Sequence, residues 1–88
     1  MTRRDRIAHV LTHRLAPLDL KVVDDSAKHA GHAGARPEGE THYSVHVVSQ
    51  AFIGKGRVER HRMVNALLSE EFDRGLHALA LSLKAPGE

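Results

Sequence analysis

The fold is decided by the stretch Thr41-His42-Tyr43-Ser44-Val45-His46-Val47-Val48-Ser49. Its side chains alternate with a period of two, as they do in a half-buried strand. One face carries the aromatic and aliphatic residues Tyr43, Val45 and Val47, and the other face is mostly polar. The stretch therefore predicts a strand, and the flanking sequence must supply its neighbours.

The residues before this strand predict a helix and another strand. Thr2 and Asp5 have the spacing of a capping box, and an apolar stripe of helical period follows from Ile7 to Leu15. Pro17 then stops the helix. The segment Leu18–Val23 again alternates with a period of two, which predicts a strand.

Between the two predicted strands the apolar pattern disappears. Residues 24–40, DDSAKHAGHAGARPEGE, are dominated by glycine, alanine and charge, which predicts a loop. This loop exceeds the length of about 12–15 residues above which loops in compact domains tend to be functional or disordered. It carries His29 and His32, whose small neighbours leave both imidazoles open.

The remaining sequence predicts a second helix and a third strand. Gly54-Lys55-Gly56 breaks the strand region, apolar residues recur at helical spacing over 58–72, and Gly75 ends that helix. The segment Leu76–Leu83 is apolar on both faces, as expected of a strand covered on at least one side. We therefore expect one α/β (α+β) domain over residues 1–88, in the order helix, strand, long loop, strand, helix, strand.

The totals of the sequence limit the classes of function. A chain of 88 residues, 41% of them hydrophobic, has room for one domain with a modest core. A helix that spans a bilayer needs about 20 apolar residues, and no apolar run is that long. No signal peptide is recognisable either. We therefore expect a cytoplasmic protein without membrane contact. A net charge of +2 with a pI near 9.4 keeps nucleic-acid binding open. We expect no enzyme, because the sequence contains no nucleotide-binding fingerprint and no supported Ser-His-Asp constellation.

Eight histidines and no cysteine define the available metal chemistry. Without thiolates, a metal site must use imidazole, carboxylate or ligands from a partner. His9 and His13 have chelating spacing on the first helix, but they lie opposite its apolar stripe, which favours a solvent-facing role. His42 and His46 have the same spacing on a strand, where it separates them by about 13 Å, so packing on the sheet face is favoured over a shared metal.

His61 lies on the helix face that it shares with Val64 and Leu68. This position favours a structural role, in which a core histidine is satisfied by a backbone carbonyl group.

His77 is placed differently, at the start of the last predicted strand. A histidine there and a histidine on a long loop can converge as two nitrogen donors. The loop donor would be His29 or His32.

Several runs of residues together resemble the BolA family. They are Asp24-Asp25-Ser26, Gly31-His32, Gly39-Glu40-Thr41-His42-Tyr43, Val47-Val48-Ser49, Phe52-x-Gly54, Val58-x-Arg60-His61-Arg62-Met63-Val64, Leu67-x-x-Glu70-Glu71 and His77-Ala78-Leu79. The resemblance covers nearly the whole chain, and its specific part is the Arg-His-Arg-Met-Val segment with the downstream His-Ala-Leu. It implies a fold similar to the type II KH domain, α-β-β-α-α-β, with a three-stranded mixed sheet covered by helices.

The resemblance also implies a function. Members of the family bind monothiol glutaredoxins and share a [2Fe–2S] cluster with them, in iron–sulfur cluster maturation and trafficking or in iron regulation. His77 matches the family's C-terminal cluster ligand, and His32 matches its variable loop ligand, with His29 as a stand-in for His32. Because this chain has no thiolate, the glutaredoxin and its glutathione would supply the sulfur.

The resemblance implies a second function as well, because some bacterial members are transcriptional regulators of stress response and cell morphology. DNA phosphates would then be contacted by the basic residues Lys55, Arg57, Arg60 and Arg62.

Two features depart from a nucleic-acid-binding KH domain. Such domains clamp the nucleic-acid backbone with a Gly-x-x-Gly loop, and Gly54-Lys55-Gly56 is one residue short of that motif. The aromatic residues Tyr43, Phe52 and Phe72 are all expected to be buried, so base stacking on them is not favoured.

Overall fold

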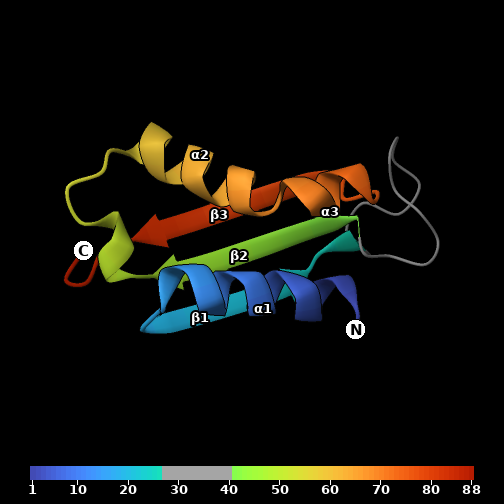
Figure 1. The fold of residues 1–88 in the computed structure, drawn as a ribbon, viewed down its shortest axis with the longest axis horizontal. Coiled ribbons are helices and arrows are strands. Elements are labelled where there is room, and N and C mark those ends of the chain that lie inside the picture. Colours follow the sequence, from blue (N-terminus) through green and yellow to red (C-terminus); the bar gives the residue numbers. More distant parts are fainter. Residues whose placement is uncertain (27–40) are drawn as a thin grey trace.

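Three strands form one mixed sheet, and the helices lie over one of its two faces (Figure 1). The computed structural model describes residues 1–26 and 41–88. The central strand is β2 (His42–Val48), with β1 (Asp19–Asp24) antiparallel to it on one side and β3 (Ala78–Lys84) parallel to it on the other. The predicted fold class is therefore confirmed, and so is the order α-β-β-α-α-β that the resemblance implies, while the predicted loop lies mostly outside the described residues.

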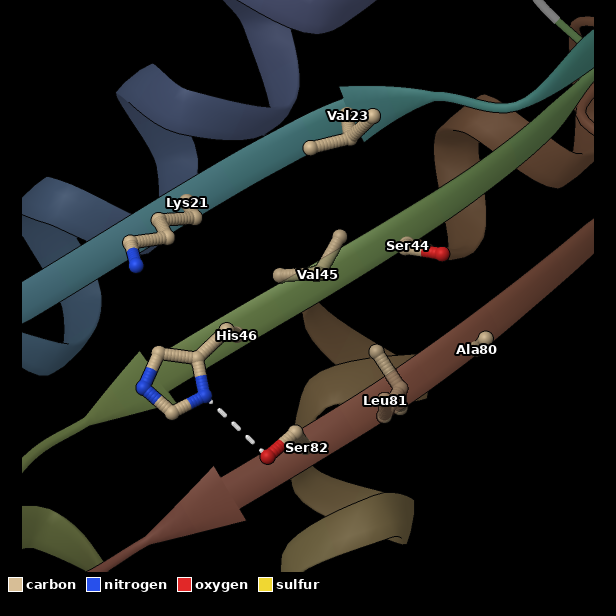
Figure 2. A pocket seen from close by; sticks show the side chains of 8 residues that line it. All are labelled: Lys21, Val23, Ser44, Val45, His46, Ala80, Leu81 and Ser82. Carbon is tan, nitrogen blue, oxygen red and sulfur yellow. Dashed lines mark hydrogen bonds between the residues drawn. The ribbon is translucent and has the colours of Figure 1, made fainter.

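The alternation in β2 separates a covered face of the sheet from an open face. Tyr43, Val45 and Val47 are buried beneath the helices, each with an exposed fraction of no more than 2%. Ser44 and His46 are only half-buried, and they project from the opposite face (Figure 2). The two-residue period thus determined which side of the sheet carries the core.

The first helix, α1 (Arg3–Leu15), begins at the predicted capping box. The Thr2 hydroxyl oxygen accepts a hydrogen bond from the Asp5 N–H at 3.1 Å, and the Asp5 carboxylate accepts one from the Thr2 N–H at 3.3 Å. The helix ends at Ala16, which adopts a left-handed conformation with φ 43° and ψ 56° before Pro17. The capping box and the proline therefore mark both ends of α1 in the sequence.

The second predicted helix consists of two helices, α2 (Arg57–Leu67) and α3 (Ser69–Asp73). They meet at Leu68, whose φ of −104° and ψ of 12° interrupt the helix and whose side chain is 1% exposed. The interruption changes which side chains of α3 face inward: Glu71 is buried and Phe72 is 38% exposed. The expectation of a buried Phe72 was therefore wrong, because the apolar spacing continues through the sequence where the helix itself does not.

A short 3-10 helix, η2 (Gln50–Phe52), connects β2 to the segment before α2. Ser49 caps it by accepting a hydrogen bond from the Ala51 N–H at 3.1 Å. Phe52 is completely buried, as expected from the sequence.

The core lies between the helices and the covered face of the sheet. Its buried hydrophobic residues are Ile7, Leu11, Leu15, Val22, Tyr43, Val45, Val47, Phe52, Val64, Leu68, Leu76, Leu83 and Ala85. Among the described residues, no helix is long and apolar enough to cross a membrane.

Candidate functional site

His77 lies directly before β3, where its side chain is exposed to solvent. Its backbone N–H donates a hydrogen bond to the Thr41 carbonyl oxygen at 2.8 Å, and the Ala78 N–H donates to the same oxygen at 3.1 Å. The position of His77 is therefore fixed by the residue that precedes β2.

Hydrogen bonds to Ser26 connect the residues that flank segment 27–40. Its hydroxyl oxygen accepts hydrogen bonds from the Thr41 N–H at 2.9 Å and from the His42 N–H at 3.1 Å. The Asp25 N–H adds a hydrogen bond to the His42 carbonyl oxygen at 2.7 Å. Because Thr41 also holds His77, both attachment points of segment 27–40 lie at the same end of the sheet as that histidine. We call this arrangement of Ser26, Thr41 and His77 the loop anchor.

His29 and His32 lie outside the described residues. Their convergence with His77 therefore stays a prediction.

His42 contacts His77, a relationship that the sequence analysis missed. The two ring centroids lie 5.5 Å apart with an angle of 49° between the planes. His42 is 8% exposed, and its Nδ1 is 2.9 Å from the Thr41 hydroxyl oxygen, which fixes the orientation of the ring. The missed signal was the parallel pairing of β2 with β3, which sets His42 opposite Ala78, beside His77.

His61 is not the core residue that the sequence predicted. Its Nδ1 lies 2.8 Å from the Arg57 carbonyl oxygen, so the predicted backbone partner is present. The side chain is nevertheless half-buried, and it lines a hollow together with Lys55 and Lys84. The reason is the orientation of α2, which directs Val64 and not His61 into the core.

The four basic residues of the proposed DNA contact are not equivalent. Arg57 and Arg62 have exposed side chains on α2. Lys55 is half-buried and forms an ion pair with Glu59, with 3.6 Å between Nζ and Oε2. The side chain of Arg60 is only 12% exposed, so it is the least accessible of the four to a phosphate.

Arg60 is held by acceptors from three parts of the chain. Its Nε donates to the Lys55 carbonyl oxygen at 2.8 Å, and its Nη1 donates to the Leu83 carbonyl oxygen at 3.2 Å. Both terminal nitrogens also bind the Glu88 carboxylate. The hydrogen bond from Arg60, helped by one from the Ala85 N–H, lowers the pKa of Glu88 to about 2.

The open face of the sheet carries a row of polar side chains, Asp19, His46 and Ser82, that crosses all three strands; Figure 2 shows His46 and Ser82. His46 lies between Asp19 and Ser82: its Nε2 is 3.4 Å from Asp19 Oδ2, and its Nδ1 is 3.1 Å from Ser82 Oγ. These residue types occur together in hydrolase triads, but here the side chains of His46 and Asp19 are 32% and 49% exposed. In such an open position water screens the charges on which a triad depends, so the row fits the predicted sheet-face role of His46.

The fold is a small α+β domain, and its loop anchor includes an exposed histidine, His77. Among the described residues, no group of three or more metal-ligating side chains gathers at one point. A metal centre that includes His77 therefore needs ligands from segment 27–40 or from a partner.

Known proteins provide close comparisons. The family model for BolA-like proteins matches residues 11–88. Protein BOLA1, chloroplastic, from Arabidopsis thaliana is 47% identical over 88 residues, which are 98% of this chain and 55% of that protein. The DNA-binding transcriptional regulator BolA from Escherichia coli is 41% identical over 81 residues, which are 92% of this chain and 73% of that protein. The solved BolA domain of SufE1 from Arabidopsis thaliana has a TM-score of 0.88 and 44% identity, and the match covers 98% of this chain and 94% of that domain.

The chain belongs to the BolA family. It spans about half the length of the Arabidopsis BOLA1 protein. Because that relative is chloroplastic, the cytoplasmic location expected from the sequence stays a prediction. The expected absence of enzymatic activity also stays a prediction.

Proposed function

We propose that this protein binds a monothiol glutaredoxin and contributes histidine ligands to a [2Fe–2S] cluster that the two proteins share. In this role it acts in iron–sulfur cluster maturation and trafficking or in iron regulation. His77 is the ligand from the sheet, and His32, or His29 in its place, is the ligand from segment 27–40.

The observation that carries this proposal is the loop anchor. The Thr41 carbonyl oxygen accepts hydrogen bonds from the His77 N–H and the Ala78 N–H, and the Ser26 hydroxyl group accepts one from the Thr41 N–H. Segment 27–40 therefore leaves and rejoins the sheet beside an exposed imidazole. This placement supports a site in which one nitrogen comes from the sheet and a second from the segment.

The donor atoms of the chain fit one half of such a cluster. Two imidazoles can replace two thiolates on one iron of a [2Fe–2S] cluster, and the cluster supplies redox or iron-sensing chemistry when bound. The chain has no cysteine, so its residues can offer nitrogen only. The sulfur ligands would come from the glutaredoxin cysteine and from glutathione.

The role of His42 in this proposal is to orient His77. His42 is buried and its ring contacts the His77 ring. The Thr41 hydroxyl group is hydrogen-bonded to Nδ1 of His42. Ligand histidines commonly depend on such a neighbouring shell for their orientation.

Anaerobic reconstitution of the chain with a monothiol glutaredoxin tests the proposal. We expect the visible absorption and circular dichroism of the shared cluster to change with His77→Ala and with His32→Ala or His29→Ala. The matched control is His46→Ala, which removes an imidazole from the open sheet face and should leave the spectra unchanged. Identical spectra for the wild type and all three ligand variants would overturn the two-histidine site.

A second candidate function is DNA binding. It is favoured by the similarity to the Escherichia coli protein, which is named as a DNA-binding transcriptional regulator. We propose Arg57 and Arg62 as the principal phosphate contacts, because both are exposed on α2. Arg57→Ala and Arg62→Ala should each weaken DNA binding and reduce the slope of log K against log salt by about 1. The matched control is Arg14→Ala on α1, which should change neither quantity.

A further inference from the structure

His9 and His13 form a pair that the proposed function does not use. They lie four residues apart on α1, and both side chains are exposed. Their ring centroids are 4.4 Å apart, with an angle of 59° between the planes. The loop anchor lies at a different place, beside the start of β3.

The pair differs from three of the four other histidines in the part of the chain that the structure describes, and the fourth, His77, is the ligand of the proposed cluster site. His42, His46 and His61 each have a polar partner for a ring nitrogen. Within residues 1–26 and 41–88, neither His9 nor His13 makes a hydrogen bond or an ion pair through its ring. Their nitrogens are therefore available to an external ligand.

The separation of the two rings suits chelation of one metal ion. A first-row metal bound at about 2.0–2.1 Å to one nitrogen of each ring keeps the two centroids about 4.5–5 Å apart. The observed 4.4 Å differs from this range by an amount that small side-chain rotations can supply. The helix also holds both rings on one side, because residues four apart are neighbours on its surface.

The surface beside the pair leaves space for further ligands. A hollow of about 400 Å³ between α1 and α2 is lined by His9, His13 and Arg14 on one helix and by Ala66 and Leu67 on the other. The positive charge of Arg14 favours a metal ion that also carries an anionic ligand, such as a carboxylate.

We propose that His9 and His13 form a binding site for a divalent transition-metal ion, with its open coordination positions directed at the hollow between α1 and α2. Nitrogen donors favour zinc, nickel and copper over magnesium and calcium, and copper(II) should bind most tightly. This site is independent of the proposed cluster site at His77.

Metal titration of the full chain tests this proposal separately from the cluster. The starting protein carries His29→Asn, His32→Asn and His77→Asn, so that the proposed cluster ligands cannot contribute. We expect it to bind zinc(II) in calorimetry, and we expect copper(II) to broaden the amide NMR signals of Val10 and Ala66. Adding His13→Asn should weaken zinc binding by about tenfold or more, because one of two nitrogen donors is lost.

A variant that keeps the number of histidines provides the matched control. His13→Asn combined with Arg14→His moves the second imidazole to five residues from His9, about 140° around the helix, where it cannot share a metal. This double substitution should not restore binding, and circular dichroism should show an intact fold. Undiminished zinc binding by either His13 variant, or copper broadening that omits the region of Val10 and Ala66, would overturn the site.

Discussion

Arg60 and Glu88 connect α2 to the residues after β3 through two parallel hydrogen bonds. Arg60 Nη1 donates to Glu88 Oε1 at 2.5 Å, and Nη2 donates to Oε2 at 2.8 Å. This is the paired geometry with which an arginine also holds a phosphate group. Glu88 therefore occupies the position on Arg60 that a nucleic-acid phosphate would need.

Releasing Arg60 from this carboxylate should increase nucleic-acid affinity. We expect Glu88→Gln to strengthen DNA binding and to increase the salt dependence by about one counterion, because a neutral amide competes less well for the guanidinium group. Fluorescence anisotropy of labelled DNA over a series of salt concentrations measures both quantities. The control is Glu70→Gln, which removes the same charge from an exposed side chain of α3, leaves Arg60 bound and should change neither quantity. A Glu88→Gln protein with the affinity and slope of the wild type would mean that Arg60 takes no part in binding.

Glu71 should make the stability of the protein depend on pH. Its carboxylate accepts hydrogen bonds from Arg6 at 2.8 and 2.9 Å and from Arg3 at 3.1 Å, which joins α3 to α1. These bonds, from Arg6 first and then from Arg3, lower the pKa of Glu71 below its usual value of 4.5. The resulting stabilisation is present above the pKa of the unfolded chain and is lost as the pH falls through the lower pKa of the folded protein.

We accordingly expect Glu71→Gln to reduce the free energy of unfolding by roughly 2 kcal/mol at neutral pH. The difference from the wild type should shrink as the pH is lowered below 4.5. Urea unfolding over a series of pH values measures it. Glu70→Gln is the matched control, because Glu70 is 76% exposed and pairs only with Arg74 at the surface among the described residues. A pH-independent difference for Glu71→Gln would contradict the assignment.

Ser49 should be important for stability because its buried hydroxyl group binds two backbone groups. It donates to the Leu15 carbonyl oxygen at the end of α1 and accepts from the Ala51 N–H in η2. Ser49 is completely buried, so Ser49→Ala leaves both groups without this partner and should cost about 1–3 kcal/mol. Denaturant unfolding measures the loss. Ser82→Ala, an exposed serine on the open sheet face, should cost much less, and equal losses for both would argue against this role of Ser49.

Ala16 offers a substitution that should stabilise the protein. Its φ of 43° lies in the left-handed region, which costs a residue with a Cβ about 1–2 kcal/mol and costs glycine little. Ala16→Gly should therefore raise the thermal unfolding midpoint, although the greater entropy of the unfolded glycine chain offsets part of the gain. Ala8→Gly, inside α1, should lower the midpoint, because glycine disfavours the helix interior. The prediction fails if Ala16→Gly lowers the midpoint as Ala8→Gly does.

The fold could be predicted from the sequence where one local period determined the structure. The alternation around Val45 and the capping box at Thr2 are such cases, because each depends on residues close together in the chain. The apolar spacing did not reveal the break at Leu68, because the break changes the backbone without changing that spacing, and only the family resemblance implied two helices here. The inward position of Glu71 depends on Arg3 and Arg6, which are distant in sequence, so no local pattern contains it.

The candidate site, too, could be predicted only in part from the sequence. His77 could be named from the sequence because it has a distinct position at the start of a strand. Its contact with His42 arises from the pairing of β2 with β3, and the Glu88 partner of Arg60 arises from the turn after β3. Such partners are set by tertiary structure, and the histidine count alone gives no sign of them.

The loop anchor has a consequence for how this protein can diversify. Thr41 is hydrogen-bonded to both Ser26 and His77, and all three residues lie outside segment 27–40. The Thr41 carbonyl oxygen is the acceptor that holds the His77 backbone, so we expect insertions, deletions and exchanges in that segment to leave this hydrogen bond in place. Under the proposed cluster function, the half of the site that lies in segment 27–40 can therefore change, for another metal or another partner, while the half at His77 stays the same.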